Sequence, residues 1–159
     1  MRNEALMEFV CGQETLAVVN TPESFEIYLP TSKTELMAML IHDVWIPVLM
    51  PGAPAATGET GATACITRNK NSAFGLQDPS VIATAQWQRF WDAGPIVRME
   101  TEWSPSHYHF DPPVLVARDI IWLKVNSDNV DSVLLTAYYR IGYTLEKVSR
   151  EAFIAALVS

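Results

Sequence analysis

Alternation of apolar and polar residues runs through most of the chain and predicts an all-β fold. Phe25, Ile27 and Leu29 alternate with polar neighbours, which is the two-residue period of a half-buried strand. The same period extends over residues 114–125 and, at its clearest, over residues 133–146, where it predicts a long central strand. Further apolar runs at residues 37–49, 62–69 and 95–103 are expected to form strands as well.

One internal segment, residues 78–94, has the pattern of a helix. Asp78 suits an N-terminal cap, Pro79 suits the first helical position, and Gly94 lies where a helix would stop. At helical spacing one face would carry Ala83, Trp87, Phe90 and Trp91. We therefore expect an internal helix whose aromatic face seals the core or a subunit interface.

A second, shorter helix is expected at the carboxyl end of the sequence. Ser149 can cap it, and Phe153, Ala156 and Leu157 share one face. The connections are expected at residues 50–62, which are rich in Pro, Gly, Ala and Thr, at the Pro-rich residues 104–113, and at a turn over residues 126–129.

These elements show no alternation of strand and helix, so a parallel sheet is not expected. Loops of unequal length and a helix between strands favour a single jelly roll, as an antiparallel β-sandwich or barrel, over an immunoglobulin sandwich. The 159 residues are one ordinary domain's worth, and we expect residues 1–159 to form a single jelly-roll domain.

The composition of the chain favours some classes of function and argues against others. The chain is 49% hydrophobic and only 18% charged, so exposed apolar surface and self-association are expected. A formal net charge of −7 argues against binding nucleic acid through phosphate contacts. No stretch approaches the roughly 20 apolar residues that cross a bilayer, so no membrane span is expected.

The segment HYHFD is the only candidate metal site in the sequence. In an extended chain His107, His109 and Asp111 project from one side, and two imidazoles with a carboxylate suit a transition metal. The H-x-H pair is similar to that of cupins, but the cupin glycines and the following Glu are missing. We therefore favour a polar or aromatic segment, with no cofactor.

His42 beside Asp43 suggests an oriented general base, but adjacent strand residues point to opposite faces unless the strand bulges there.

The sequence contains no nucleophile elbow, phosphate-binding loop or paired-cysteine motif. Cys11 and Cys65 allow at most one disulfide, and we expect both to be small buried residues. These observations favour a protein that is not an enzyme.

Five tryptophans are many for this length, at positions 45, 87, 91, 103 and 122. They suit either a lectin-like site in which sugars stack on exposed rings, or the core and a subunit interface, and we favour the second.

Three segments carry a resemblance to a known class of protein: FEIYLPTSKTELMAMLIHDVWI, DPPVLVARDIIWLKV and AYYRIGYTLEKVSREAFIAALV. They resemble small single jelly-roll capsid proteins of uncultured viruses of prokaryotes or archaea. The resemblance implies a structural protein that forms rings or a shell with copies of itself, assembles in the host cytoplasm and resides in the virion, with other virion proteins as further candidate partners.

Many such capsid proteins carry a basic N-terminal arm, whereas residues 1–30 contain only Arg2 as a positive side chain. No direct contact with nucleic acid is therefore expected. The candidate interface residues are Trp87, Phe90, Trp91, Phe153 and Leu157. The alternatives are a lectin-like glycan-binding module and a cupin-like metal enzyme built on His107, His109 and Asp111.

Overall fold

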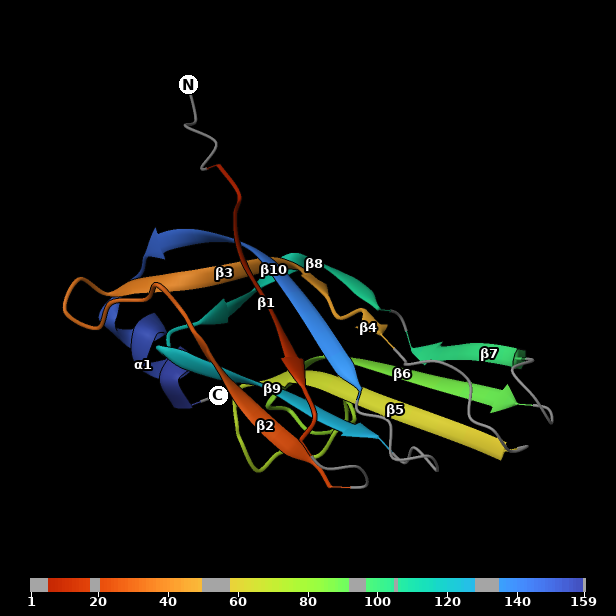
Figure 1. Ribbon diagram of the computed structural model, residues 1–159. Coiled ribbons are helices and arrows are strands. Elements are labelled where there is room, and N and C mark those ends of the chain that lie inside the picture. The colour runs from red at the N-terminus through yellow and green to blue at the C-terminus, as the bar shows by residue number, and fades with distance from the viewer. Residues whose placement is uncertain are drawn as a thin grey trace.

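The computed structural model describes residues 6–17, 21–49, 58–91, 97–104, 106–127 and 135–158. These residues form an antiparallel β-sandwich with one short helix (Figure 1). The elements in chain order are β1 (Glu8–Thr15), β2 (Glu23–Tyr28), β3 (Met37–Trp45), β4 (Val48–Leu49), β5 (Gly58–Thr67), β6 (Val81–Trp91), β7 (Val97–Ser104), β8 (His107–Val116), β9 (Ile120–Ser127), β10 (Thr136–Lys147) and α1 (Arg150–Val158).

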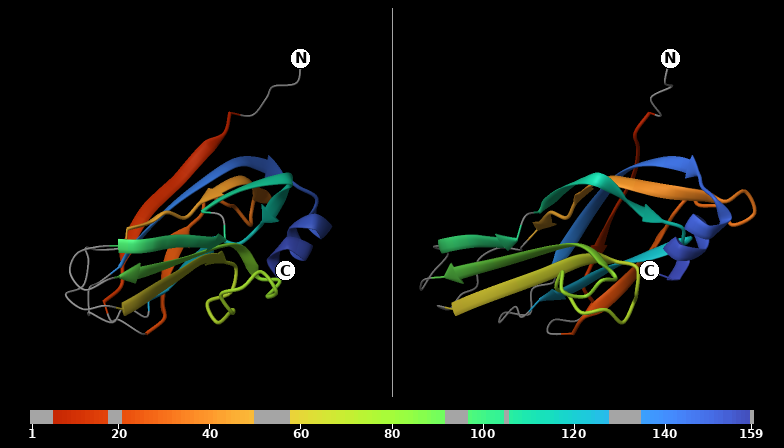
Figure 2. Two further views of the ribbon diagram at one scale, coloured as in Figure 1. Left: turned by 90° about the vertical axis from the view of Figure 1, so that its right-hand side faces the viewer. Right: turned by 180° about the vertical axis from the view of Figure 1, so that it is seen from behind.

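The strands divide into two sheets that pack face to face (Figure 2). In sheet A the order is β1-β10-β3-β8, and the short β4 pairs with β10 beside β3. In sheet B the order is β2-β9-β5-β6-β7. Every pairing is antiparallel, and most neighbours in a sheet come from distant parts of the chain.

One apolar core fills the space between the sheets, as alternating strands with one buried face require. Both sheets contribute side chains with less than 2% of their surface exposed: Leu16, Ile27, Met39, Ile41, Val44, Ile46, Ile66, Val116, Ile121, Leu123, Leu135 and Ile141.

Helix α1 closes one end of the sandwich (Figure 1). Its start is capped as expected, because the Ser149 hydroxyl accepts a hydrogen bond from the Ala152 amide at 3.2 Å. Phe153 and Ala156 are buried against Ala38 of β3 and Ala117, which follows β8. Among the described residues no helix is long and apolar enough to cross a membrane.

Several strand predictions are confirmed. The alternating residues Phe25, Ile27 and Leu29 belong to β2 and its end, with Ile27 and Leu29 buried. β10 lies between β1 and β3, as expected of a long central strand. The sequence left open whether the strand bulges at His42, and the structure shows that it does, because the consecutive β10 residues Gly142 and Tyr143 pair with Asp43 and Ile41.

The predicted internal helix is wrong. Residues 81–91 form strand β6, which pairs with β5 from Thr67↔Val81 to Gly58↔Trp91, while residues 92–96 lie outside the described chain. Positions four apart, such as Ala83 and Trp87, share a face in a strand as well as in a helix. The discriminating residue is Ala85 between them, which is fully buried and follows the two-residue period.

Asp78 does cap a backbone turn, but in the loop that precedes β6. Its carboxylate accepts hydrogen bonds from the Ser80 hydroxyl and amide and from the Ala73 amide, which together lower the pKa of Asp78. The sequence signal for a cap was therefore real, and the element that follows it is a strand.

Four predicted boundaries are also wrong. Residues 58–62 of the expected loop belong to β5, and the expected connection at 104–113 is mostly β8. Pro112 and Pro113 fit there because β8 is an edge strand of sheet A, where a missing backbone donor costs little. The expected single strand over 114–125 is divided at residues 117–119, where the chain passes from sheet A to sheet B. The turn expected at 126–129 lies partly in β9, and residues 128–129 lie outside the described chain.

The two cysteines are not bonded to one another. Cys65 is buried as expected, whereas Cys11 is exposed on β1. The prediction that both are buried is therefore wrong for Cys11, because β1 lies at the edge of sheet A and turns this residue outward.

The packing predicts unequal effects for the same substitution at two leucines. Leu123 is fully buried in β9, whereas Leu76 is 53% exposed. Leu123→Ala is expected to lower the free energy of unfolding by about 2–5 kcal/mol through lost burial and a cavity, and Leu76→Ala by less than about 1 kcal/mol. Denaturant unfolding followed by circular dichroism measures both, and equal losses would contradict the described core.

Candidate functional site

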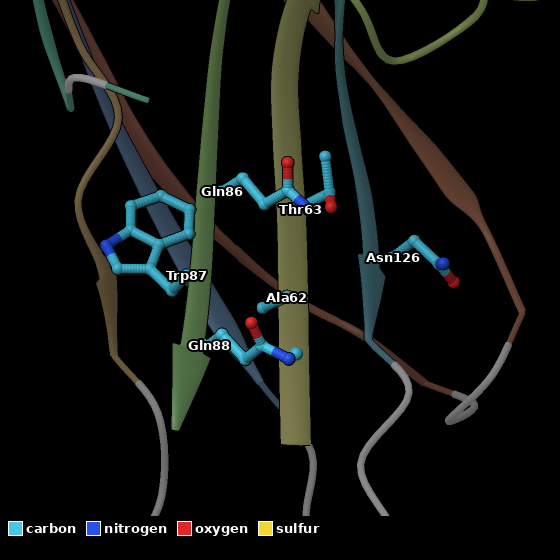
Figure 3. A pocket seen from close by; sticks show the side chains of 7 residues that line it. Ala62, Thr63, Gln86, Trp87, Gln88 and Asn126 are labelled. Atoms are coloured by element: carbon cyan, nitrogen blue, oxygen red, sulfur yellow. The ribbon is translucent and has the colours of Figure 1, made fainter. Parts of the chain in front are cut away.

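A shallow cleft lies on the outer face of sheet B, at the end away from α1 (Figure 3). It has a volume of about 210 Å³ and is lined by Gly61, Ala62, Thr63, Gln86, Trp87, Gln88 and Asn126. The side chains of Gln86 and Gln88 extend from β6 across β5 (Figure 3). Gln88 Oε1 and Asn126 Oδ1 are buried without a hydrogen-bond partner. The lining is thus mainly polar, uncharged and rich in amides.

Nearer to α1, the loop between β5 and β6 covers the outer face of sheet B. Lys124 is 7% exposed, donates a hydrogen bond from Nζ to the Ser72 carbonyl and lies 4.9 Å from the centre of the Phe74 ring. Cys65 pairs with Lys124 across the strands, and burial raises the pKa of its thiol to about 12. A thiol with that pKa is unreactive at neutral pH, so this region is structural.

On sheet A, the bulge in β3 decides which side chains face outward. Ile41, Val44 and Ile46 all lie in the core, because His42 is an extra residue in the pairing of β3 with β10 and shifts the alternation by one position. As a result Asp43 and Trp45 lie on the face of sheet A that is turned away from the core. In the pairing with β8, Asp43 lies opposite His109, and Trp45 lies opposite His107.

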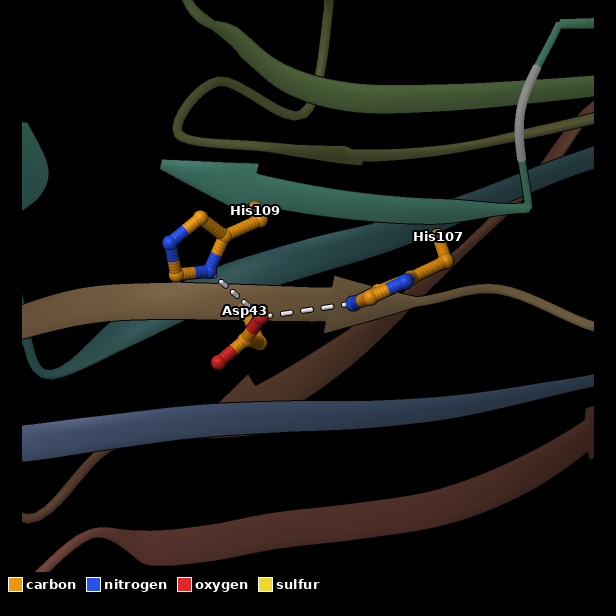
Figure 4. A network of polar contacts seen from close by, with 3 residues as sticks. All are labelled: Asp43, His107 and His109. Atoms are coloured by element: carbon orange, nitrogen blue, oxygen red, sulfur yellow. Dashed lines mark hydrogen bonds and ion pairs between the residues drawn. The ribbon is translucent and has the colours of Figure 1, made fainter. Parts of the chain in front are cut away.

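Asp43 forms hydrogen bonds with both histidines of the H-x-H pair (Figure 4). Its Oδ1 lies 3.0 Å from His109 Nδ1 and 3.3 Å from His107 Nε2. Burial of Asp43 alone would raise its pKa, but the hydrogen bonds and charges of His109 and His107 outweigh this effect and lower the pKa below its ordinary value. The carboxylate is therefore held in its ionised form.

Aromatic rings and one guanidinium surround this cluster. The Trp45 and His107 rings stack with centroids 4.5 Å apart and an interplanar angle of 3°. Arg140, opposite Trp45 on β10, lies 4.0 Å from the Phe9 ring centre and 5.2 Å from that of Trp45. We call these residues the sheet A patch: Phe9, Asp43, Trp45, His107, His109 and Arg140.

Gly142 makes room for this arrangement. A Cβ atom at this position would lie 2.9 Å from Met7 Sδ and 3.2 Å from Phe9 Cε1. A side chain at this position would require the Met7 and Phe9 side chains to shift, so the glycine allows both to lie close to β10.

The structure brings together only part of the predicted metal site. His107 and His109 converge on Asp43 rather than on Asp111, which is exposed on β8. The two imidazoles approach the carboxylate from opposite sides (Figure 4), so the three groups do not surround one point. Within the described ranges no group of three His, Cys, Asp or Glu residues is arranged to hold a metal ion. His42 contacts Thr144 at 3.0 Å instead of its neighbour Asp43.

The predicted interface residues have different surroundings from those expected. Trp87 lies in the main core, and Phe153 is 3% exposed beneath α1, so both are used within the protomer. Leu157 packs partly buried beside Phe153, and Phe90 is half-buried on β6. The side chains of Trp91 and Trp103 lie outside the described part of the structure. Trp87 and Phe153 fill apolar space inside one chain, and a role of the five residues in an interface stays a prediction.

The sequence alone did not identify Asp43 as the partner of the histidines. Asp43 and His109 are 66 positions apart and meet only because β3 pairs with β8. Each imidazole that donates one ring N–H to Asp43 keeps its second nitrogen for another partner. The side-chain hydrogen bonds of His107 and His109 in the described part of the chain run to Asp43, and none runs to a serine, threonine or cysteine.

Comparisons with known proteins identify no family for this chain, because no family model and no curated protein matches it.

Asp43 is expected to stabilise the fold in a pH-dependent way. At neutral pH, Asp43→Asn should lower the free energy of unfolding by about 1–3 kcal/mol, because two hydrogen bonds to a charged acceptor are weakened. A lowered carboxyl pKa contributes stability that is present above the ordinary value of 3.8 and disappears as the pH falls through the folded-state value.

Denaturant unfolding of wild type and Asp43→Asn between pH 7 and pH 3 measures this effect. The difference should be largest near neutral pH and shrink toward the acid end. Asp119→Asn is the matched control, because Asp119 is exposed and pairs with Lys33 only at 3.7 Å. An Asp43→Asn difference that is independent of pH would contradict the assignment.

Proposed function

We propose that the sandwich is a single jelly roll and that the protein is a structural, self-assembling shell protomer, a viral capsid protein that resides in the virion. The order of strand pairing supports the jelly roll. β1 pairs with β10, β2 with β9, β3 with β8 and β5 with β6, so the partners are nested like the two halves of one long antiparallel ribbon. Such a ribbon, rolled up, is the jelly-roll arrangement.

Apolar and aromatic side chains on the surface support the proposed self-assembly. The patch on the outer face of sheet A combines the exposed Phe9 with Trp45 and Arg140, which are residue types enriched at protein interfaces. Other large apolar side chains are exposed on the described surface: Leu6, Met7, Tyr28, Leu76, Ile154 and Val158. Contact with further copies of the chain would cover these groups.

Open strand edges offer a second means of association. In the described sheets the outermost strands are β1 and β8 in sheet A and β2 and β7 in sheet B. Unpaired backbone groups at such edges can accept a strand from a neighbour. Because the formal net charge is −7, the proposed shell would not bind the genome directly through this chain, and other virion proteins remain further candidate partners.

The oligomeric state tests the proposal directly. We expect size-exclusion chromatography with light scattering to give a mass well above the 17.7 kDa of one chain, and negative-stain microscopy to show rings or shells. A monodisperse monomer at high protein concentration, without symmetric particles, would overturn the proposed function.

Two charge-adding variants on one strand identify the surface involved. Phe9 and Gln13 are both exposed on β1 and four residues apart, so they share a face. Phe9→Glu is expected to weaken association about tenfold or more, because it places a charge in the sheet A patch. Gln13→Glu adds the same charge outside the patch and should assemble like wild type. Equal behaviour of the two variants would exclude the patch as a contact surface.

A glycan-binding module is the second candidate, and the cleft on sheet B favours it. The unpartnered amide oxygens of Gln88 and Asn126 can accept hydrogen bonds from sugar hydroxyl groups. The Trp87 ring points away from the two glutamine side chains (Figure 3), so the described lining has no aromatic platform for stacking.

A glycan array tests this candidate. If the cleft binds a saccharide, Gln88→Ala should abolish the signal, and Gln13→Ala, a substitution on the exposed face of β1, should preserve it. An array on which wild-type protein binds no glycan would remove the candidate.

A further inference from the structure

Two arginines lie side by side near the end of the sandwich that α1 closes. Arg68 follows β5, and Arg118 lies between β8 and β9. Arg118 donates a hydrogen bond from Nη1 to the Arg68 carbonyl at 3.1 Å, and Arg68 donates one from Nη1 to the Pro79 carbonyl at 3.3 Å. Both side chains are half-buried, and both of these partners are neutral carbonyls.

The positive charge of this pair is not balanced by acidic side chains. Asp119, next to Arg118 in the sequence, pairs with Lys33 instead, at 3.7 Å. Asp78 uses its carboxylate oxygens for Ser80 and Ala73. Within the described residues neither arginine forms an ion pair, although burial and the charge of Arg118 both disfavour a second cation and lower the pKa of Arg68.

Three buried N–H donors in this region have no acceptor. They are Arg68 Nε, Arg118 Nε and the indole Nε1 of Trp122. Buried donors are almost always hydrogen-bonded in folded proteins, so three without acceptors near two unpaired cations indicate a missing partner. That partner must supply acceptors and negative charge, which are the properties of an oxyanion.

Grooves on the surface give access to both arginines. One, of about 310 Å³, is lined by Lys33, Arg118, Asp119, Ile120, Trp122 and Leu157. The other, of about 460 Å³, is lined by Arg68, Val114, Leu115, Ala152, Ala155 and Ala156. The first groove combines cations with the indole, and the second is mostly apolar.

We infer that Arg118 and the indole N–H of Trp122 form a binding site for a small oxyanion beside α1, with Arg68 adjoining it through the hydrogen bond between Arg118 and the Arg68 carbonyl. The oxyanion group lies in the groove of Arg118 and Trp122, with Lys33 at its rim. Asp119 is also at the rim, and its pairing with Lys33 limits its repulsion of the ligand. The oxyanion is either a free phosphate or the carboxylate of an amphiphile whose chain would occupy the apolar groove. The site is independent of the proposed assembly.

Isothermal titration calorimetry on the full chain, at constant ionic strength, tests the site with two probes. Inorganic phosphate represents the free anion, and octanoate represents a carboxylate that carries an apolar chain. We expect saturable binding of at least one probe. Arg118→Gln should weaken it about tenfold or more, and Trp122→Phe, which keeps an aromatic ring but removes the N–H, should weaken it severalfold.

Two matched variants test whether the loss of a positive charge or of an indole N–H elsewhere in the protein has the same effect on probe binding. Arg140→Gln removes one positive charge from sheet A, and Trp45→Phe removes an indole N–H there, so both should bind the probe like wild type. Arg118→Lys, which keeps the charge but loses the guanidinium donors, serves if Arg118→Gln does not fold, and it should also bind more weakly. Absence of saturable binding of both probes, or equal weakening by Arg118→Gln and Arg140→Gln, would overturn the inference.

Discussion

Antiparallel pairing of β10 with strands from the start of the chain holds sheet A together. β10 lies between β1 on one side and β3 with β4 on the other, so three early segments depend on one late strand. Its inward residues Ala137 and Ile141, and Leu135 just before it, are almost completely buried. A slip of one residue would turn this apolar row toward solvent, and the register is therefore determined by burial. In sheet B, β2 pairs with β9 and β5 pairs with β6, so these pairings are also nested along the chain.

One irregularity at His42 of β3 connects the core with the outer surface. Against β10, His42 is an extra residue, because the consecutive residues Gly142 and Tyr143 pair with Asp43 and Ile41. Against β8, the register shifts at the same point, where residues 110–113 lie opposite His42. The shift in β3 keeps Val44 in the core and also turns Asp43 toward His109. Core packing and the composition of the sheet A patch thus have a common local cause.

The outer faces of the two sheets differ in what they leave accessible. Sheet A presents aromatic rings, a guanidinium and two histidines around one carboxylate. Sheet B is partly covered by the loop that buries Lys124 against Ser72 and Phe74, and it leaves a polar cleft at its other end. An assembly in which sheet A makes contacts and sheet B carries small ligands is consistent with this division, and the arginine pair beside α1 is a third, separate feature.

The amino-acid sequence by itself determined the β class, most of the strands and the cap at Ser149. These features depend on residues within a few positions of each other, because side chains alternate along a strand and a cap bonds to the next turn. Only the tertiary structure decided that residues 81–91 form a strand, since Ala83 and Trp87 suit a helix equally well. It also decided that Asp43, not Asp111, joins His107 and His109. Contacts between residues as far apart as 66 positions depend on which strands pair, and local patterns carry no record of that choice.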